Sequence, residues 1–120
     1  YGYCLETQHS YQFDGSAGAR QMKDIMEAFR AKGADMDGLE VKQVLDYEQG
    51  LEGLPKSNVL KYVLKDGGTV ILRPSGTEPK LKLYLSVSSR RKEDLEEMER
   101  QRAEAVERFM ENVRTGNSHE

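Results

Sequence analysis

Residues 73–79, which read RPSGTEP, combine side chains that could together bind an anion. The guanidinium of Arg73 can meet two oxygens at once, and the hydroxyls of Ser75 and Thr77 add further donors. Gly76 lets the backbone turn so that successive N–H groups converge, while the flanking prolines restrict the segment. This set of groups suits a phosphate monoester, which carries about two negative charges.

The same residues also suit a plain hairpin loop, because Pro, Ser, Gly and Thr are common in turns. Length favours a functional loop, since the segment is longer than a tight hairpin needs and longer loops often carry function. Lys80 follows directly and is a second-tier candidate, whose ammonium would add charge without bidentate geometry. The residues alone leave both interpretations open.

Two apolar stretches flank the segment and predict strands. TVILR (69–73) is rich in β-branched residues, and KLKLYLSV (80–87) alternates with a period of two. We expect Leu81, Leu83, Leu85 and Val87 to face a core, and Lys80, Lys82, Tyr84 and Ser86 to face away. A sheet with one solvated face is usually antiparallel.

Three more strands are predicted, at residues 3–13, 41–49 and 58–65, from aromatic and β-branched content with approximate alternation. In the last of these, Leu60, Tyr62 and Leu64 should share one side. Asp66-Gly67-Gly68 predicts a hairpin turn with a positive φ at a glycine.

Two helices complete the pattern. Ser16 can cap the first, and Gly33 should stop it. Ser88-Ser89 should open the second, in which Arg102 interrupts the apolar spacing, so we expect an amphipathic helix on the sheet rather than a coiled coil. The apolar stripes are Met22, Ile25, Met26 and Phe29 in the first helix, and Leu95, Met98, Val106, Phe109, Met110 and Val113 in the second. The charged run from Arg90 onward should be a solvated face.

The predicted order is therefore β-α-β-β-β-β-α, an α+β fold in which two helices cover one face of an antiparallel sheet. With 120 residues, 37% of them hydrophobic and 32% charged, the chain fits one compact domain. A net charge of -3 argues against binding to nucleic acid. No apolar run of membrane-spanning length and no signal-peptide pattern occurs, so we expect a soluble, cytoplasmic protein without a membrane partner.

The sequence offers no pattern of metal ligands. Cys4 is the only cysteine, and the two histidines, His9 and His119, lie far apart. Residues 35–38, DMDG, imitate the start of a metal loop, but the third aspartate is missing, which favours a surface turn.

The stretch NVLKYVLKDGGTVILRPSGTEPKLKLYLSV resembles the C-terminal (fourth) domain of the α-D-phosphohexomutases, the phosphoglucomutase and phosphomannomutase superfamily. The resemblance extends upstream through YGYCLE and DGSAGARQMKDIMEAFR, and it is most specific at RPSGTEPK. It implies a TATA-box-binding-protein-like fold for the domain, which we place at residues 1–114. The polar end TGNSHE (115–120) predicts a disordered tail. Residues 1–13 could also be the linker strand that enters from a preceding domain.

The resemblance further implies a role for the loop. Members of this family are intramolecular phosphotransferases of carbohydrate metabolism, isomerases that move phosphate between the C1 and C6 positions of a hexose. They use a phosphoserine, Mg²⁺ and a hexose bisphosphate, and the loop grips the phosphate that is not being transferred. Carried over, the phosphate-binding residues would be Arg73, Ser75, Gly76, Thr77 and, less directly, Lys80. The partners would be the phosphosugar and the preceding domains, while Lys56, Ser57 and Asn58 match a family-like segment without an assigned role.

The chain also departs from the family. The catalytic serine loop, the Asp-x-Asp-Gly-Asp metal loop and the Gly-Glu-x-Ser-Gly sugar loop are absent, so we expect no catalytic residue, metal ligand or cofactor here and no activity from this chain alone. Two alternatives remain: a small module that binds RNA or protein, for which the outward aromatics are sparse beyond Tyr84, and a purely structural domain.

Overall fold

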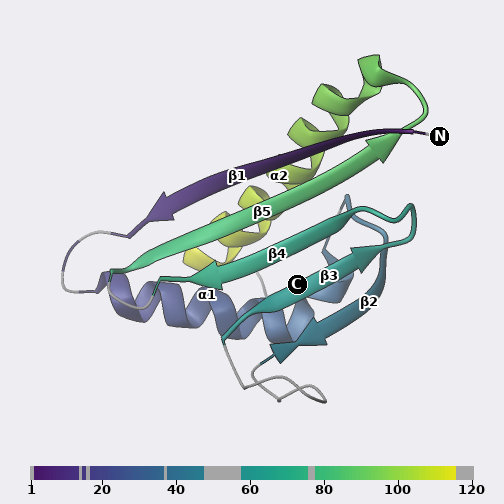
Figure 1. Ribbon diagram of the computed structural model, residues 1–120. Helices are drawn as coiled ribbons and strands as arrows, with labels where there is room; N and C mark the ends of the chain where they lie inside the picture. The colour runs from purple at the N-terminus through teal and green to yellow at the C-terminus, as the bar shows by residue number, and fades with distance from the viewer. Residues whose placement is uncertain are drawn as a thin grey trace.

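The computed structural model describes residues 2–13, 15, 17–36, 38–47, 58–75 and 78–115. Five antiparallel strands form one sheet in the order β1-β5-β4-β3-β2 (Figure 1). The strands are β1 (Tyr3–Gln12), β2 (Val41–Asp46), β3 (Leu60–Leu64), β4 (Thr69–Pro74) and β5 (Lys80–Ser89). The helices are α1 (Gly18–Lys32) and α2 (Leu95–Thr115). The predicted α+β class and element order are confirmed.

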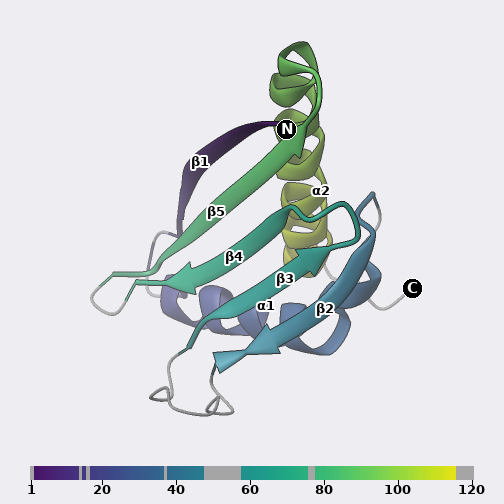
Figure 2. The same ribbon diagram turned by 45° about the vertical axis from the view of Figure 1, so that its right-hand side comes forward.

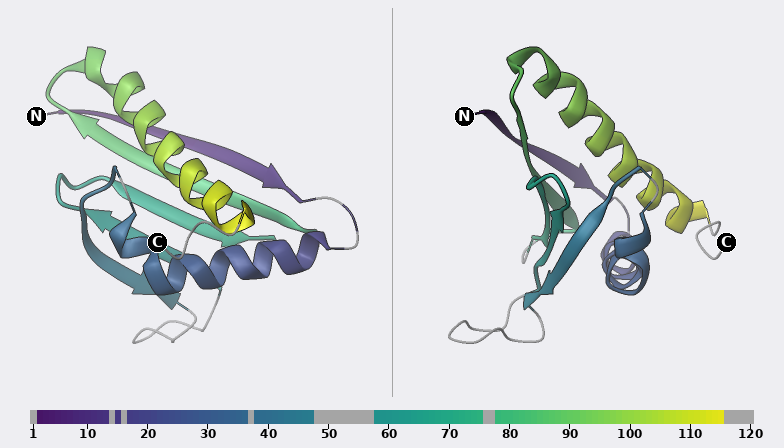
Figure 3. Two further views of the ribbon diagram at one scale, coloured as in Figure 1. Left: turned by 180° about the vertical axis from the view of Figure 1, so that it is seen from behind. Right: turned by 90° about the vertical axis from the view of Figure 1, so that its right-hand side faces the viewer.

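Both helices lie on the same face of the sheet, which Figure 3 shows from behind and from the side. Helix α2 packs on β5 and β1 and also contacts α1. The opposite face, turned toward the viewer in Figure 2, is covered by neither helix, and we call it the open face. No helix among the described residues is long and apolar enough to cross a membrane.

The core lies between the sheet and the helices, on the side that strand alternation predicts. The predicted inward residues of β3 and β5 are buried, and so are most of the two helical stripes. Phe29 of α1 stacks on Phe109 of α2 with the ring centroids 4.5 Å apart. The predicted hairpin between β3 and β4 is confirmed, with φ 92° at Gly67.

Helix α1 ends where Gly33 predicts, but for a different reason. Gly33 has φ -62°, so the chain continues into a short 3-10 turn rather than adopting a left-handed cap. A Cβ at Gly33 would lie 2.1 Å from the hydroxyl oxygen of Tyr62. That hydroxyl donates to the carbonyl of Phe29 at 2.7 Å, and burial raises the pKa of Tyr62, so the phenol stays neutral. Close packing, not turn geometry, requires the glycine.

The second helix begins later than predicted. Ser88 and Ser89 belong to β5, where Ser89 pairs with Tyr3 of β1, and α2 starts at Leu95 after a 3-10 turn. Strand pairing with a distant segment therefore overrides the capping tendency of the two serines. The Ser89 hydroxyl instead accepts a hydrogen bond from the Arg91 N–H at 3.1 Å.

Arg102 occupies its unusual position on α2 because it reaches the β3–β4 turn. Its guanidinium pairs with Asp66 and lies against Gly68, where an added Cβ would come within 2.5 Å of it. Burial opposes ionisation of Asp66, but hydrogen bonds from the Gly68 N–H and from Arg102 outweigh it and lower the pKa of Asp66.

The structure places Ala17, without a side-chain cap, at the N-cap of α1, and β2 ends at Asp46, earlier than the predicted residue 49, with Tyr47 already outside the strand. Thr115, predicted to begin the tail, is the last residue of α2. Ser16 itself and residues 116–120 lie outside the described residues.

Candidate anion site

The described residues of the RPSGTEP segment lie at one end of the sheet, where β4 ends and β5 begins. Arg73 and Pro74 are the last residues of β4, and Lys80 is the first residue of β5. Gly76 and Thr77 lie outside the described residues, so their phosphate-binding roles stay predictions. Backbone hydrogen bonds hold the positions on either side of them.

Backbone hydrogen bonds close the base of this loop. The Ser75 N–H donates to the carbonyl of Lys80, and the Phe13 N–H donates to the carbonyl of Pro79, each at 2.8 Å. The second bond ties the loop to the end of β1, a segment far away in sequence. Because the base is fixed before any ligand arrives, less conformational entropy is lost when a ligand binds.

The guanidinium of Arg73 carries a positive charge that no described residue balances. Its side chain is exposed and forms no hydrogen bond or ion pair with any described residue. Lys82 of β5 stands directly opposite Arg73 in the strand register. Paired residues of antiparallel strands point to the same face, and like charges there destabilise a sheet unless an anion lies between them.

Lys82 is a candidate site residue that the sequence analysis missed. Alternation in β5 correctly placed its side chain on the outward face, which is the open face, together with Tyr84. The same alternation says nothing about which residue of the next strand lies beside it. Only the pairing of β4 with β5 brings Lys82 next to Arg73.

Lys80 adds a third cation at the same end of the open face, since it lies two residues before Lys82. Its Nζ atom is 3.9 Å from the Oε1 atom of Glu78, whose side chain is 53% exposed. An ion pair at this distance in solvent contributes little free energy, so Lys80 remains able to interact with an anion. The structure thus brings together Arg73, Lys80 and Lys82.

Helix α1 supports this end of the sheet from the other side. The Nε atom of Arg30 donates to Asp46 Oδ2 at 3.1 Å, and its Nη2 atom donates to Asn58 Oδ1. Pro74 and Asn58 border a cavity of about 300 Å³ against α1. Asn58, whose role the sequence left open, thus contacts the supporting helix, whereas Lys56 and Ser57 lie outside the described residues.

A separate polar cluster fastens β1 to α2. Glu99 Oε2 lies 2.5 Å from His9 Nε2 and accepts a hydrogen bond from the Thr7 hydroxyl at 2.8 Å. Burial opposes ionisation of Glu99, but these two hydrogen bonds outweigh it and hold the pKa of Glu99 below its usual value. Tyr11 donates to Glu107 at 2.7 Å in the same way. These contacts join strand to helix on the covered face of the sheet, opposite the face that carries Arg73 and Lys82.

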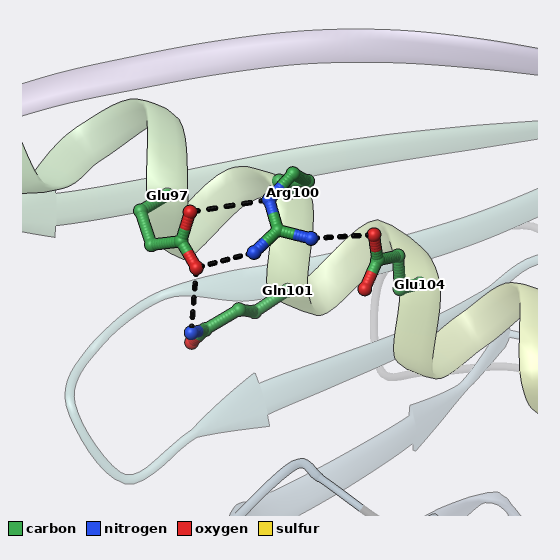
Figure 4. A network of polar contacts seen from close by, with 4 residues as sticks. All are labelled: Glu97, Arg100, Gln101 and Glu104. Atoms are coloured by element: carbon green, nitrogen blue, oxygen red, sulfur yellow. Dashed lines mark hydrogen bonds and ion pairs between the residues drawn. The ribbon is translucent and has the colours of Figure 1, made fainter.

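Much of the charged run in α2 forms a solvated face, as predicted, but Glu99 and Arg102 are exceptions, with side chains only 15% and 14% exposed. Arg100 donates to Glu97 at 3.1 Å and to Glu104 at 2.6 Å, and Gln101 also donates to Glu97, at 2.9 Å (Figure 4). The Glu97 and Arg100 side chains are more than half exposed. This network stabilises the helix surface and is not a candidate site.

The described residues give little support to a metal site or an RNA platform. Within them, no three His, Cys, Asp or Glu side chains gather closely enough to hold a metal ion. Among the described strand positions that alternation assigns to the open face, Tyr84 is the one aromatic residue. Recognition of single-stranded RNA on a sheet usually needs two or three stacked bases, hence more aromatic side chains.

Comparison with known proteins gives consistent matches. The family model for the phosphoglucomutase/phosphomannomutase C-terminal domain matches residues 15–115. A phosphoglucomutase of Staphylococcus epidermidis is 40% identical over 91 residues, covering 66% of this chain and 16% of that protein. A phosphoglucomutase of Staphylococcus aureus is 38% identical over 102 residues, covering 75% of this chain and 18% of that protein.

A solved structure shows the same fold. The open form of pp63/parafusin, a phosphoglucomutase from Paramecium, superposes with a TM-score of 0.53 at 18% identity. The match covers 91% of this chain and 20% of that one. The chain therefore spans less than a fifth of the two staphylococcal relatives and corresponds to one domain of such proteins.

Proposed function

The chain belongs to the phosphoglucomutase/phosphomannomutase family as its C-terminal domain, and on this premise we propose that it grips the substrate phosphate of a longer phosphohexomutase. The parent enzyme would interconvert a sugar 1-phosphate and a sugar 6-phosphate. In this proposal the loop 73–77, with Lys80 beside it, holds the phosphate that is not being transferred. Preceding domains of the same enzyme would supply the reacting groups.

The observation that carries the proposal is the opposed pair of Arg73 and Lys82. Two cations side by side, without a balancing acid among the described residues, fit a dianionic ligand such as a phosphate monoester. Arg73 would contribute a bidentate fork, whereas Lys82 and Lys80 would contribute charge. We therefore add Lys82 to the phosphate-binding residues expected from the family.

The expected affinity suits a domain that closes over substrate held elsewhere. Three or four charge-assisted hydrogen bonds contribute about 1.5 to 3 kcal/mol each, and association costs at least about 4 kcal/mol. The difference lies between about 0.5 and 8 kcal/mol, and the middle of that range, about 4 kcal/mol, corresponds to millimolar affinity for the isolated chain. In the parent enzyme the same contacts would stabilise a closed state that excludes water.

Mg²⁺ and a hexose bisphosphate belong, in this proposal, to the rest of the parent enzyme. The described residues of this chain hold no cluster of ligands suited to a metal ion, and we derive no metal-dependent step for them. The cytoplasmic location expected from the sequence is part of the same proposal.

A titration of the 120-residue chain with inorganic phosphate, followed by NMR, tests the proposal. We expect amide shifts at Arg73, Ser75 and Lys82 that saturate in the millimolar range. Arg73→Gln should abolish them, whereas Lys61→Gln, a matched change on the same face, should leave them in place. Unshifted resonances at these residues up to tens of millimolar phosphate would refute a phosphate-gripping role and favour a purely structural loop.

A further inference from the structure

The open face has a hollow directly beyond the Arg73–Lys82 pair. It has a volume of about 400 Å³ and lies over β1, β5 and β4, on the face turned toward the viewer in Figure 2. Its lining includes the side chains of Glu6, Gln8, Thr69, Ile71, Tyr84 and Ser86.

The strand register fixes how the hollow and the cations are arranged. Tyr84 stands opposite Ile71 on one side and Gln8 on the other, and this trio is the next open-face row after Lys82 and Arg73. Rows of the same face are two residues apart, which is about 7 Å along a strand. This spacing is comparable with the reach from a phosphoryl group to the ring of the hexose that carries it.

The chemistry of the hollow suits a sugar ring. Its floor is apolar, formed by the ring of Tyr84 and the side chain of Ile71, and both are half-buried. Three polar groups surround that floor: the amide of Gln8, the hydroxyl of Thr69 and the carboxylate of Glu6. None of these three side chains forms a hydrogen bond or ion pair with another described residue. Ligand sites commonly combine an apolar surface with a few polar groups that fix orientation. A hexose presents C–H groups to such a floor and hydroxyls to such a rim.

The charges around the hollow and the Arg73–Lys82 pair determine which way a phosphosugar would lie. Arg73 and Lys82 lie at one end, while the carboxylate of Glu6 lies in the row beyond Tyr84, opposite Ser86. A phosphate placed near Glu6 would be repelled, whereas a sugar hydroxyl can donate to that carboxylate. A phosphosugar would therefore lie along the strands with its phosphate toward the loop.

We propose that this hollow holds the hexose ring of the phosphosugar whose phosphate binds at Arg73 and Lys82. The inference rests on the proposed function and extends it, because it gives the sheet surface a part in choosing the sugar. The domain would then recognise the ring as well as the charge.

A comparison of three ligands tests the inference in the 120-residue chain: inorganic phosphate, glycerol 3-phosphate, which lacks the ring, and glucose 6-phosphate. We expect glucose 6-phosphate to bind about five- to tenfold more tightly than glycerol 3-phosphate, a difference that one aromatic contact and a hydrogen bond can supply. Only the hexose ligand should shift the NMR resonances of Gln8, Ile71 and Tyr84.

Variants separate the ring contact from the phosphate contact. Tyr84→Ala and the exposed, conservative Glu6→Gln should each reduce the preference for the hexose ligand and leave the affinity for inorganic phosphate unchanged. Val63→Ala, on the same face but outside the hollow, is the matched control and should alter neither.

The outcomes that contradict the two proposals differ. Equal affinities for glucose 6-phosphate and glycerol 3-phosphate, without shifts at Tyr84, would overturn the hexose site and leave the phosphate grip intact. The hollow would then be available to a side chain from elsewhere in the parent enzyme. If inorganic phosphate fails to shift Arg73 and Ser75, the proposed function fails and the hexose site falls with it.

Discussion

Arg73 at the end of β4 and Lys82 in β5 stand directly opposite each other on the open face, and no described residue neutralises Arg73. In the absence of an anion this arrangement costs stability, because like charges at opposed strand positions repel each other. A ligand phosphate would remove that cost. Under the proposed function, the pair therefore favours a bound anion at the expense of the stability of the free chain.

Replacement of Lys82 by Met should stabilise the free chain. Relief of the repulsion is expected to raise the free energy of unfolding by roughly 0.2 to 1 kcal/mol at low salt. The gain should shrink in 1 M salt, where charges are screened beyond about 3 Å. Thermal denaturation at both salt concentrations measures it. Lys61→Met is the control, since Lys61 stands opposite Ile71 and Leu45, and an equal gain from both variants would contradict the argument.

Arg73→Lys in the full-length parent enzyme should impair catalysis without unfolding the protein. An ammonium keeps the charge but cannot meet two phosphate oxygens in a planar fork. We expect kcat/KM to fall by more than about tenfold, which corresponds to about 1.4 kcal/mol. Arg91→Lys, at an exposed position near the opposite end of β5, should keep wild-type kinetics. Wild-type kinetics from Arg73→Lys itself would count against the phosphate grip.

Glu99→Gln should lower the free energy of unfolding at neutral pH and make that free energy depend less on pH in the acid range. The folded state holds the pKa of Glu99 below its usual value, whereas the unfolded chain titrates near about 4.3. The ionised carboxylate therefore stabilises the fold above that pH, and its contribution is lost as the pH falls through the lower, folded-state pKa. We expect a loss of about 1 kcal/mol at pH 7 that disappears in acid, measured by urea denaturation between pH 3 and pH 7.

The control for Glu99 is the same substitution at Glu97, on the same helix. Arg100 lowers the pKa of Glu97 through a hydrogen bond, but this pair is solvent-exposed (Figure 4). Exposed ion pairs contribute little to stability, so Glu97→Gln should leave the free energy of unfolding in the acid range almost unchanged. If both variants behave alike, the contact of Glu99 with His9 has no special part in acid stability.

Gly33→Ala should destabilise the fold more than Gly67→Ala does. A Cβ at Gly33 meets the buried phenol of Tyr62 at 2.1 Å, although the backbone there is ordinary. At Gly67 the space is open, and only the positive φ opposes a side chain, at a cost of about 1 to 2 kcal/mol. We expect about 3 kcal/mol or more at Gly33, as overpacking in a core predicts. Equal losses in urea denaturation would show that Tyr62 yields to the added methyl group.

Local sequence signals predicted most of the fold where each signal was strong. The period of two in KLKLYLSV correctly predicted the buried and outward faces of β5. The start of α2 was predicted wrongly, because Ser88 and Ser89 resemble a helix cap but precede the 3-10 turn that leads into the helix. Ser88 and Ser89 failed as a helix start because their partners in β1 lie at the other end of the chain. A capping preference depends on neighbouring residues, whereas the length of β5 depends on how far its pairing with the distant strand β1 extends.

The sequence by itself determined the α+β order, the core-facing side of each strand and the candidate residues Arg73, Ser75 and Lys80, because these follow from periodicity and from side-chain chemistry within short segments. The tertiary structure alone decided that Lys82 stands beside Arg73 and that Tyr84 and Ile71 form the floor of a hollow. The physical reason is that register depends on hydrogen bonds between strands and on the summed burial of both faces, and neither is visible within a single strand.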